Sequence, residues 1–500
     1  MLIRTSAAIC VSFILLLPCV VSGGEILNLS LSDAVEAAMK NNRMRLVSSA
    51  SVRIAKAQHE QATSGYWPQL KLSVSATRMD HDPNFVFPQY TYDIGAANAT
   101  PLAEAIAAAQ LSKQGITPST PGYNTMLEQL TAQILPNVQK TSIPQQDVKL
   151  MDRDSLVSTL SLIYPLYTGG KVSSVVRQAE LGIDAAREAA RRTDLQVVDD
   201  VKRMYYAAVL SERLYELGKE TLERFEVTLE LTERLYKTGS GRVKKTDYLR
   251  TSVVVSSIRA MMETLKSNLE LSRSALANAI GLTWSDQVVP TDKAENIEPA
   301  VPALDEAVAN ALKLNPQVNQ VRIGVDAAKA KIDEAKSGHL PVLVLFGDVN
   351  RIDNSYHAGL MTDQNKKSWM IGLRIDLNLF EGFRTRGEVA EARARFEKIN
   401  VEDSLLREGV ALQVKDAVLQ VSRSKGQITS TREALASATE NRELNTRAYQ
   451  QELVETKDVI EAQLMELFIH SQYQKAIYDY QSGIASLEFL VGREVAERSQ

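Results

Sequence analysis

An internal duplication is the feature that most constrains how this chain of 500 residues can fold. One register relates residues 31–35 to residues 304–308 at an offset of 273. A second register relates residues 165–171 to residues 378–384 at an offset of 213, and Tyr236 and Tyr449 keep it. The change of 60 in the offset (273 − 213) means that the first half carries an insertion. We therefore predict two structural repeats, although length alone suggests about three domains.

These matches set the predicted boundaries. The first repeat covers residues 25–300, with an insertion at 80–150 between its two strands, and the second repeat covers residues 301–494. Residues 495–500 form a C-terminal tail. The insertion holds seven of the 15 prolines, so we expect an exposed loop of mixed structure. Its position between two strands is the basis for expecting it on the extracellular side.

The first segment, residues 1–24, has the pattern of a secretory signal peptide. Arg4 precedes an apolar stretch at 9–21, and small residues follow as a cleavage site. The stretch is shorter than the roughly 20 residues of a transmembrane helix. Both cysteines, Cys10 and Cys19, lie in this segment, so the processed chain would form no disulfide. Whether Cys19 carries a lipid is left open.

Long stretches without proline favour very long helices. Proline is absent from residues 166–289 and from residues 342–500. We predict one helix in each repeat at 32–64 and 305–337, and a rod of roughly 100 Å at 385–449. Inside the rod, a coiled-coil seam is predicted at Val410, Val414, Ala417, Val421, Ile428 and Leu435.

Alternation of apolar and polar residues predicts β-strands. Residues 70–77 alternate, residues 369–379 have six apolar positions in eleven, and residues 156–164 show a weaker pattern. This length and pattern are typical of transmembrane β-strands. Four strands cannot close a barrel, and lipid does not tolerate an open sheet edge, so several chains would be required. Three copies would supply 3 × 4 = twelve strands.

The alternative is a soluble sheet with half-buried strands. The chain would then be a non-conducting periplasmic coiled-coil scaffold. The outward faces of the strands distinguish the two hypotheses, because a channel requires an apolar girdle that faces lipid and a scaffold does not.

Enzymatic chemistry has little support in the sequence. Residues 169–171 read Gly-Gly-Lys but lack the first glycine and the Ser/Thr of a phosphate loop. The five histidines have no metal-ligand spacing. A net charge of −4 without a basic stripe argues against nucleic acid as a partner. We predict no catalytic residues, no cofactor and no metal site.

The doubled motifs resemble those of the TolC family of outer-membrane efflux channels. They are the Leu-Ser opening at 29–38, its repeat at 304–311, the Pro-Leu-Tyr-x-Gly-Gly turn at 165–170 and Leu-Phe-Glu-Gly at 379–382. The resemblance implies a mixed α+β membrane protein, a homotrimer with a shared twelve-stranded β-barrel and an α-helical coiled-coil tunnel. It also implies the outer membrane of a Gram-negative bacterium, contact with its lipid, and a tunnel in the periplasm.

The resemblance further implies partners. A periplasmic adaptor (membrane fusion protein) and an inner-membrane pump of the RND or ABC type would feed the tunnel. The chain would be the exit duct of a tripartite efflux system or of a type I secretion system. The substrate, the pump and the choice between the two systems stay open.

The resemblance also assigns roles at the periplasmic tip of the tunnel. Asp458 and Glu461, spaced i, i+3 on one helix face, match an acidic pair at the channel entrance. An ordinary solvated helix face is the alternative for this pair. Glu452 stands where the family usually has glycine. Contacts within the tip or with the adaptor are assigned to Tyr236, Gly239, Arg242, Asp247, Arg250, Tyr449 and Val454.

Overall fold

The computed structural model describes residues 26–239, 241–292, 301, 303–354 and 366–492. The predicted signal peptide, with Cys10 and Cys19, and the predicted tail lie outside the described residues. The chain divides into two compact units. A helical unit comprises the described parts of Met1–Ser64, Gly170–Gly338 and Phe380–Gln500, and a strand unit comprises Gly65–Gly169 and the described part of His339–Leu379.

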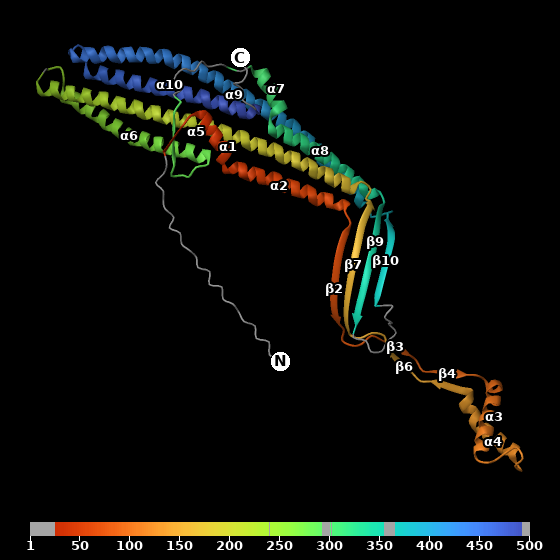
Figure 1. Cartoon of the computed structure of the whole chain (residues 1–500). Coiled ribbons are helices and arrows are strands. Elements are labelled where there is room, and N and C mark those ends of the chain that lie inside the picture. Colours follow the sequence, from red (N-terminus) through yellow and green to blue (C-terminus); the bar gives the residue numbers. More distant parts are fainter. Residues whose placement is uncertain (1–25, 240, 293–300, 302, 355–365, 493–500) are drawn as a thin grey trace, which may run out of the picture. The chain divides into compact units, whose positions relative to one another are not determined.

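In the helical unit, each helix of the first repeat has a counterpart in the second repeat. In the first repeat it has α1 (Leu31–Asn41), α2 (Arg43–Thr63), α5 (Lys171–Lys237) and α6 (Lys245–Ile280). In the second repeat it has α7 (Leu304–Leu314), α8 (Pro316–Lys336), α9 (Arg384–Gln450) and α10 (Thr456–Val491). Matching helices have equal lengths of 11, 21, 67 and 36 residues. Figure 1 shows the hairpins α5–α6 and α9–α10 side by side.

The hydrophobic cores of the two repeats also correspond residue by residue. Val197 and Val201 of α5 are buried with Ala34 of α1 and Leu276 of α6. In the second repeat, the equivalent residues Val410, Val414, Ala307 and Leu487 are buried together in a core of their own. A short parallel pair, β1 (Ile26–Leu29) with β8 (Gln287–Pro290), adds Val288 to the first core. The predicted seam of α9 is confirmed at its first five positions, which are buried, whereas Leu435 is half-buried.

The prediction of single helices at 32–64 and 305–337 was wrong, because each is interrupted at an asparagine. The Asn42 backbone is extended, and its side chain accepts a hydrogen bond from Met44 N at 2.8 Å. Its Nδ2 donates to the carbonyl oxygen of Ala279 at 2.8 Å. Asn315 does the same with Gln317 N and the carbonyl oxygen of Leu490. Each asparagine therefore starts a new helix and ties it to the end of a long one.

Beside each asparagine, a glycine permits two backbones to touch. Gly281 ends α6 with φ +97°, and a Cβ atom there would lie 2.6 Å from the carbonyl oxygen of Asn41. Gly492 ends α10 with φ +82°, and its Cβ would lie 2.6 Å from the carbonyl oxygen of Leu314. A side chain at either position would push the two helix ends apart.

The strand unit contains the four predicted strands as one antiparallel sheet. These are β2 (Gln69–Arg78), β7 (Asp154–Tyr167), β9 (Val342–Asn354) and β10 (Lys367–Asp376). Their order is β10-β9-β7-β2, so one central pair, β7 with β9, joins the two repeats. Strands β2 and β10 are the edges of an open sheet (Figure 1).

The insertion between β2 and β7 has more regular structure than the loop predicted for 80–150. Two short ribbons pair β3 (Asn84–Phe87) with β6 (Gln146–Lys149) and β4 (Tyr90–Asp93) with β5 (Lys140–Ile143). A helical hairpin follows, made of α3 (Ala96–Lys113) and α4 (Tyr123–Gln139). Within the described part of the chain, no helix combines the length and the apolar character required to cross a membrane.

We expect Gly281→Ala to lower the thermal midpoint of unfolding, measured by circular dichroism in detergent. A left-handed backbone costs a non-glycine residue about 1 kcal/mol or more, and the contact with Asn41 adds to this. Gly409→Ala in α9 is the control, because a Cβ there meets no atom within 4 Å. Equal midpoints for the two variants would contradict the tight helix junction.

Candidate functional site

One face of the four-stranded sheet carries a continuous apolar row with further apolar side chains beside it. Residues directly opposite each other on paired strands share a face. The pairing places Leu72, Leu160, Val349 and Trp369 in one row across all four strands. In this chain Trp369 is 75% exposed and Leu72 67% exposed. Further apolar side chains on this face are Leu70, Val74, Leu162, Ile371, Leu373 and Ile375. We call these side chains and the row together the apolar band.

The opposite face of the sheet is polar in its middle. The row next to the apolar one consists of Ser73, Thr159, Asn350 and Ser368. Beyond it, the Ser161 hydroxyl donates to Asp348 Oδ1 at 2.6 Å. The sheet can therefore meet an apolar medium on one face and water on the other.

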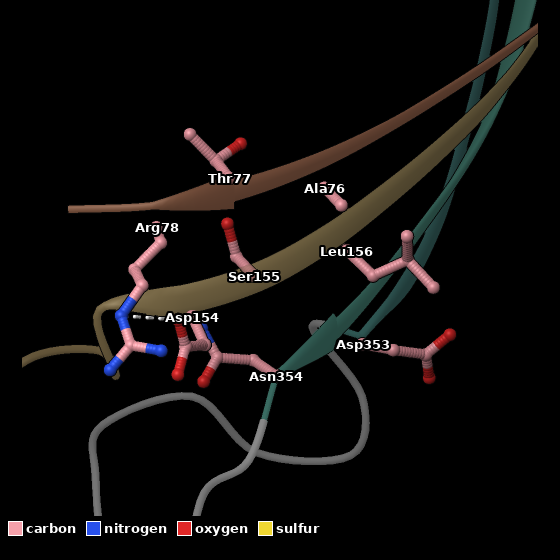
Figure 2. A pocket seen from close by; sticks show the side chains of 8 residues that line it. All are labelled: Ala76, Thr77, Arg78, Asp154, Ser155, Leu156, Asp353 and Asn354. Carbon is pink, nitrogen blue, oxygen red and sulfur yellow. Dashed lines mark ion pairs between the residues drawn. The ribbon is translucent and has the colours of Figure 1, made fainter.

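Charged residues follow where the apolar band ends, around a hollow of about 510 Å³ (Figure 2). Arg78 and Asp154 pair across β2 and β7 at 3.6 Å, and Arg351 pairs with Asp353 at 2.7 Å. The hollow is lined by Ala76, Thr77, Arg78, Asp154, Ser155, Leu156, Asp353 and Asn354. Across the described residues, no three His, Cys, Asp or Glu side chains gather as a metal site would require.

The second candidate region is the pair of turns that close the helical hairpins, here called the tip. Gly239 ends the first turn sequence Tyr-x-x-Gly with φ +74°, and Glu452 occupies the equivalent position with φ +58°. The second turn thus keeps the glycine conformation without the glycine. In the first hairpin, Tyr236 stacks on Tyr248 with ring centroids 6.5 Å apart.

Tyr449 connects three helices at the tip. It is 3% exposed, and its hydroxyl lies 2.8 Å from Thr232 Oγ1 of α5 and 3.0 Å from Thr456 Oγ1 of α10. Arg242 of the first turn donates to the carbonyl oxygen of Glu452 in the second. The two turns are therefore hydrogen-bonded to each other.

A hollow of about 530 Å³ lies between these turns. Of the predicted tip residues, it brings together Arg242, Tyr449, Val454 and Asp458. Tyr236, Gly239, Arg250 and Glu461 are exposed and do not line it. The remaining lining residues are Leu235, Val243, Glu452, Leu453, Glu455 and Thr456.

The two predicted aspartates have a structural role that their sequence pattern did not reveal. Asp247 Oδ2 accepts a hydrogen bond from Lys244 N at 2.9 Å, and Asp458 Oδ2 accepts one from Glu455 N at 3.0 Å. Each carboxylate thus stabilises the first turn of its helix. Glu461, one turn after Asp458, is exposed and lies 3.7 Å from Lys457 Nζ.

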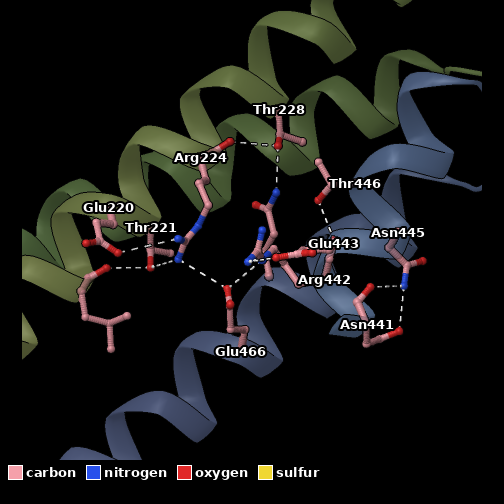
Figure 3. A network of polar contacts seen from close by, with 12 residues as sticks. Glu220, Thr221, Arg224, Thr228, Asn441, Arg442, Glu443, Asn445, Thr446 and Glu466 are labelled. Carbon is pink, nitrogen blue, oxygen red and sulfur yellow. Dashed lines mark hydrogen bonds and ion pairs between the residues drawn. The ribbon is translucent and has the colours of Figure 1, made fainter. Parts of the chain in front are cut away.

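A buried ionic network that sequence reasoning missed lies further along the same helices (Figure 3). The Glu466 side chain of α10 is 7% exposed and lies 3.5 Å from Arg224 of α5 and 3.1 Å from Arg442 of α9. Gln463, one turn earlier, donates to Thr228 Oγ1 at 3.1 Å. A buried carboxylate between two guanidinium groups ties α10 to both long helices, and removing one partner would leave an uncompensated charge.

Histidine 470 lies one turn beyond Glu466 on α10. Burial lowers the pKa of His470, which favours its neutral form, and its Nε2 lies 3.3 Å from Gln474 Nε2.

Comparison with known proteins establishes the class to which this architecture belongs. The family model described as Outer membrane efflux protein matches residues 129–282 and 307–493. The chain therefore belongs to the outer membrane efflux protein family, and it is an outer-membrane protein with a mixed α+β fold of two repeats. This confirms the predicted resemblance.

Among individual relatives, the chain is 25% identical over 352 residues to Alkaline protease secretion protein AprF of Pseudomonas aeruginosa. The match covers 68% of this chain and 70% of AprF. It is 22% identical to Outer membrane protein TolC of Salmonella enteritidis, over 59% of each chain. The chain thus spans about three fifths of the length of that TolC.

Solved structures show the same fold over nearly the whole chain. The outer membrane protein VceC of Vibrio cholerae superposes with a TM-score of 0.66 at 18% identity, covering 93% of this chain and 96% of VceC. CusC gives a TM-score of 0.67 at 16% identity, covering 94% of each chain.

We expect Glu452→Gly to raise the thermal midpoint, because it removes a left-handed non-glycine residue that costs about 1 kcal/mol. The contact from Arg242 is made to the backbone and is kept. Gly239→Ala, at the equivalent position, is expected to lower the midpoint. A lower midpoint for Glu452→Gly would mean that the glutamate side chain itself holds the turn.

Proposed function

We propose that three copies of this chain form an outer-membrane channel, the exit duct of a tripartite efflux or type I secretion system. The apolar band beside two unpaired edge strands carries this proposal. An open sheet edge is not tolerated in lipid, so β2 and β10 require partner strands. Three sheets of four strands close into a twelve-stranded barrel when β2 of one copy pairs with β10 of the next.

The faces of the sheet support the same assignment. In the closed barrel, the row from Leu72 to Trp369 faces lipid, and the row from Ser73 to Ser368 faces the lumen. A soluble scaffold would leave Trp369 and its neighbours in water, which is unfavourable for an apolar surface of this extent. The proposed duct performs no chemistry and requires no cofactor.

The proposed partners are a periplasmic adaptor and an inner-membrane pump of the RND or ABC type. Tyr236, Gly239 and Arg250 are exposed and are available for contact with the adaptor. Arg242, Asp247, Tyr449 and Val454 shape the turns that present them. AprF is named for protease secretion and another relative, BepC of Brucella suis, for efflux, so the likeness supports both kinds of system.

We further propose that Asp458 and Glu461 form an acidic ring at the channel entrance. Three copies would place 3 × 2 = six carboxylates around the axis, a pattern that favours cations over anions. The half-buried Asp458 caps α10 through Oδ2, and the exposed Glu461 makes no capping contact. The two residues can therefore be tested separately.

The protein extracted in detergent is expected to have about three times the mass of one chain and to resist alkaline extraction from the outer membrane. Leu72→Lys should impair assembly, because lysine in the middle of a lipid-facing band costs about 2–4 kcal/mol. Ser73→Lys, on the polar face of the same strand, is the matched control. A soluble monomer would support the scaffold alternative instead.

Neutralising the acidic pair should reduce cation selectivity, measured as the reversal potential across planar bilayers in a salt gradient. We expect a partial loss in Glu461→Gln and a larger loss when Asp458→Asn is added, because each change removes three charges from the trimer. Asparagine keeps an oxygen that can cap α10. Asp479→Asn, further along α10, controls for charge elsewhere on the helix, and unchanged selectivity in the double variant would contradict the ring.

A further inference from the structure

The helix α3 of the insertion has two apolar faces but buries only one. Ala99, Ala103, Ala107 and Leu111 are at most 5% exposed, in the helical hairpin that α3 forms with α4. A second apolar stripe, here called the outer seam, consists of Leu102, Ala105, Ile106 and Ala109, all exposed. Helices that are apolar all round are ordinarily buried on all sides. Among the described residues, therefore, nothing covers the outer seam.

The composition of the helical hairpin also indicates a surface that is covered by another protein chain. Between residues 96 and 139, the only charged residues are Glu104, Lys113 and Glu128. A surface with so few charges is typical of a protein contact. Lys113 is the only cation, so the hairpin offers little to the anionic headgroups that attract basic helices to membranes.

The spacing of the outer seam defines the kind of contact. Leu102, Ile106 and Ala109 are separated by four and three residues, as the core positions of a coiled coil are. Small residues such as Ala105 and Ala109 allow helices to approach closely. A parallel helix of the same sequence is a suitable cover.

The insertion is joined firmly to the sheet at the end where β2 stops and β7 starts. Met79 N donates to the carbonyl oxygen of Arg153, and Leu150 N donates to that of Pro83. At the junction, Asp82 accepts from Arg153 N at 2.7 Å and lies 2.8 Å from Lys149 Nζ. The ribbons thus continue the pair formed by β2 and β7, and β2 is the edge proposed to meet the next copy.

We infer that α3 is a self-association surface, and that the outer seams of three copies pack against one another in a parallel three-helix contact. This inference rests on the proposed trimer, because the barrel would bring three hairpins together at the same end of the sheet. The contact covers Leu102 and Ile106 and forms a cap over that end of the barrel.

The test introduces single cysteines into the full-length protein. Its own cysteines, Cys10 and Cys19, lie in the predicted signal peptide, so the processed protein would carry only the introduced thiol. Ile106→Cys and Ala109→Cys place a thiol in the outer seam, and Glu104→Cys places one on another face of the same helix. Purified proteins are treated with a short bismaleimide and separated on a denaturing gel, and the native mass in detergent is measured in parallel. Linked pairs of chains are expected from both seam variants and not from Glu104→Cys.

The outcomes separate the inference from the proposed function. A native mass of three chains without linkage at positions 106 and 109 would overturn the inference and leave the channel intact. A native mass of one chain would overturn both. A fluorescent label is also attached at position 106. If its emission maximum shifts to the blue in phosphatidylethanolamine vesicles while the bismaleimide links no chains, the seam binds lipid and the inference is also overturned.

Discussion

Backbone N–H and C=O groups that lie in lipid have to be hydrogen-bonded within the protein, and this requirement governs the strand unit. The inner strands β7 and β9 meet it within one chain, because each is paired on both sides. The edge strands β2 and β10 each have one side without a partner strand in the sheet. The apolar band extends to these edges, so the surface that suits lipid and the edges that cannot remain open in lipid belong to the same sheet.

The duplication explains why the helical unit can be both long and regular. Equivalent residues form the hydrophobic cores of the two repeats. In each repeat, an asparagine with a nearby glycine fixes the helix junction. Within the helical unit, the two repeats differ mainly in the turns. Glu452 and Phe383 have left-handed backbones where the first repeat has Gly239 and Gly170. The second repeat thus keeps the conformation without its most favourable residue, which places local strain at both ends of α9.

Much of this architecture could be predicted from the sequence, because its signals are periodic. Period-two alternation located β2 and β10 to within about three residues, and proline-free stretches located α9. The break at Asn42 was missed because the helical pattern continues through it. The break at Asn315 has a local signal, Pro316 at the start of α8, which the prediction of one continuous helix did not use. The contacts of the two asparagines with the distant carbonyls of Ala279 and Leu490 have no local signal.

The candidate site was predicted less completely, for a physical reason. Turn motifs located the tip, but the hydrogen bond between Tyr449 and Thr232 depends on α5, which lies far away in the sequence. Glu466 was missed because a single glutamate on a helix resembles a solvated one until Arg224 and Arg442 are placed beside it. The helices of the insertion were missed because its prolines resemble those of a loop, although Pro101 and Pro136 lie inside α3 and α4.

The central pairing of β7 with β9 has a consequence for the order of folding. The Ser161–Asp348 hydrogen bond joins residues 187 positions apart, and every contact of this ladder likewise joins a strand of the first repeat to a strand of the second. Ladders of such long range form slowly, because the intervening chain has to be ordered or looped out first. The first repeat can build its own helices and the hairpin of β2 with β7 while the second is still being made. The complete apolar band, in contrast, cannot exist until both halves of the chain are present.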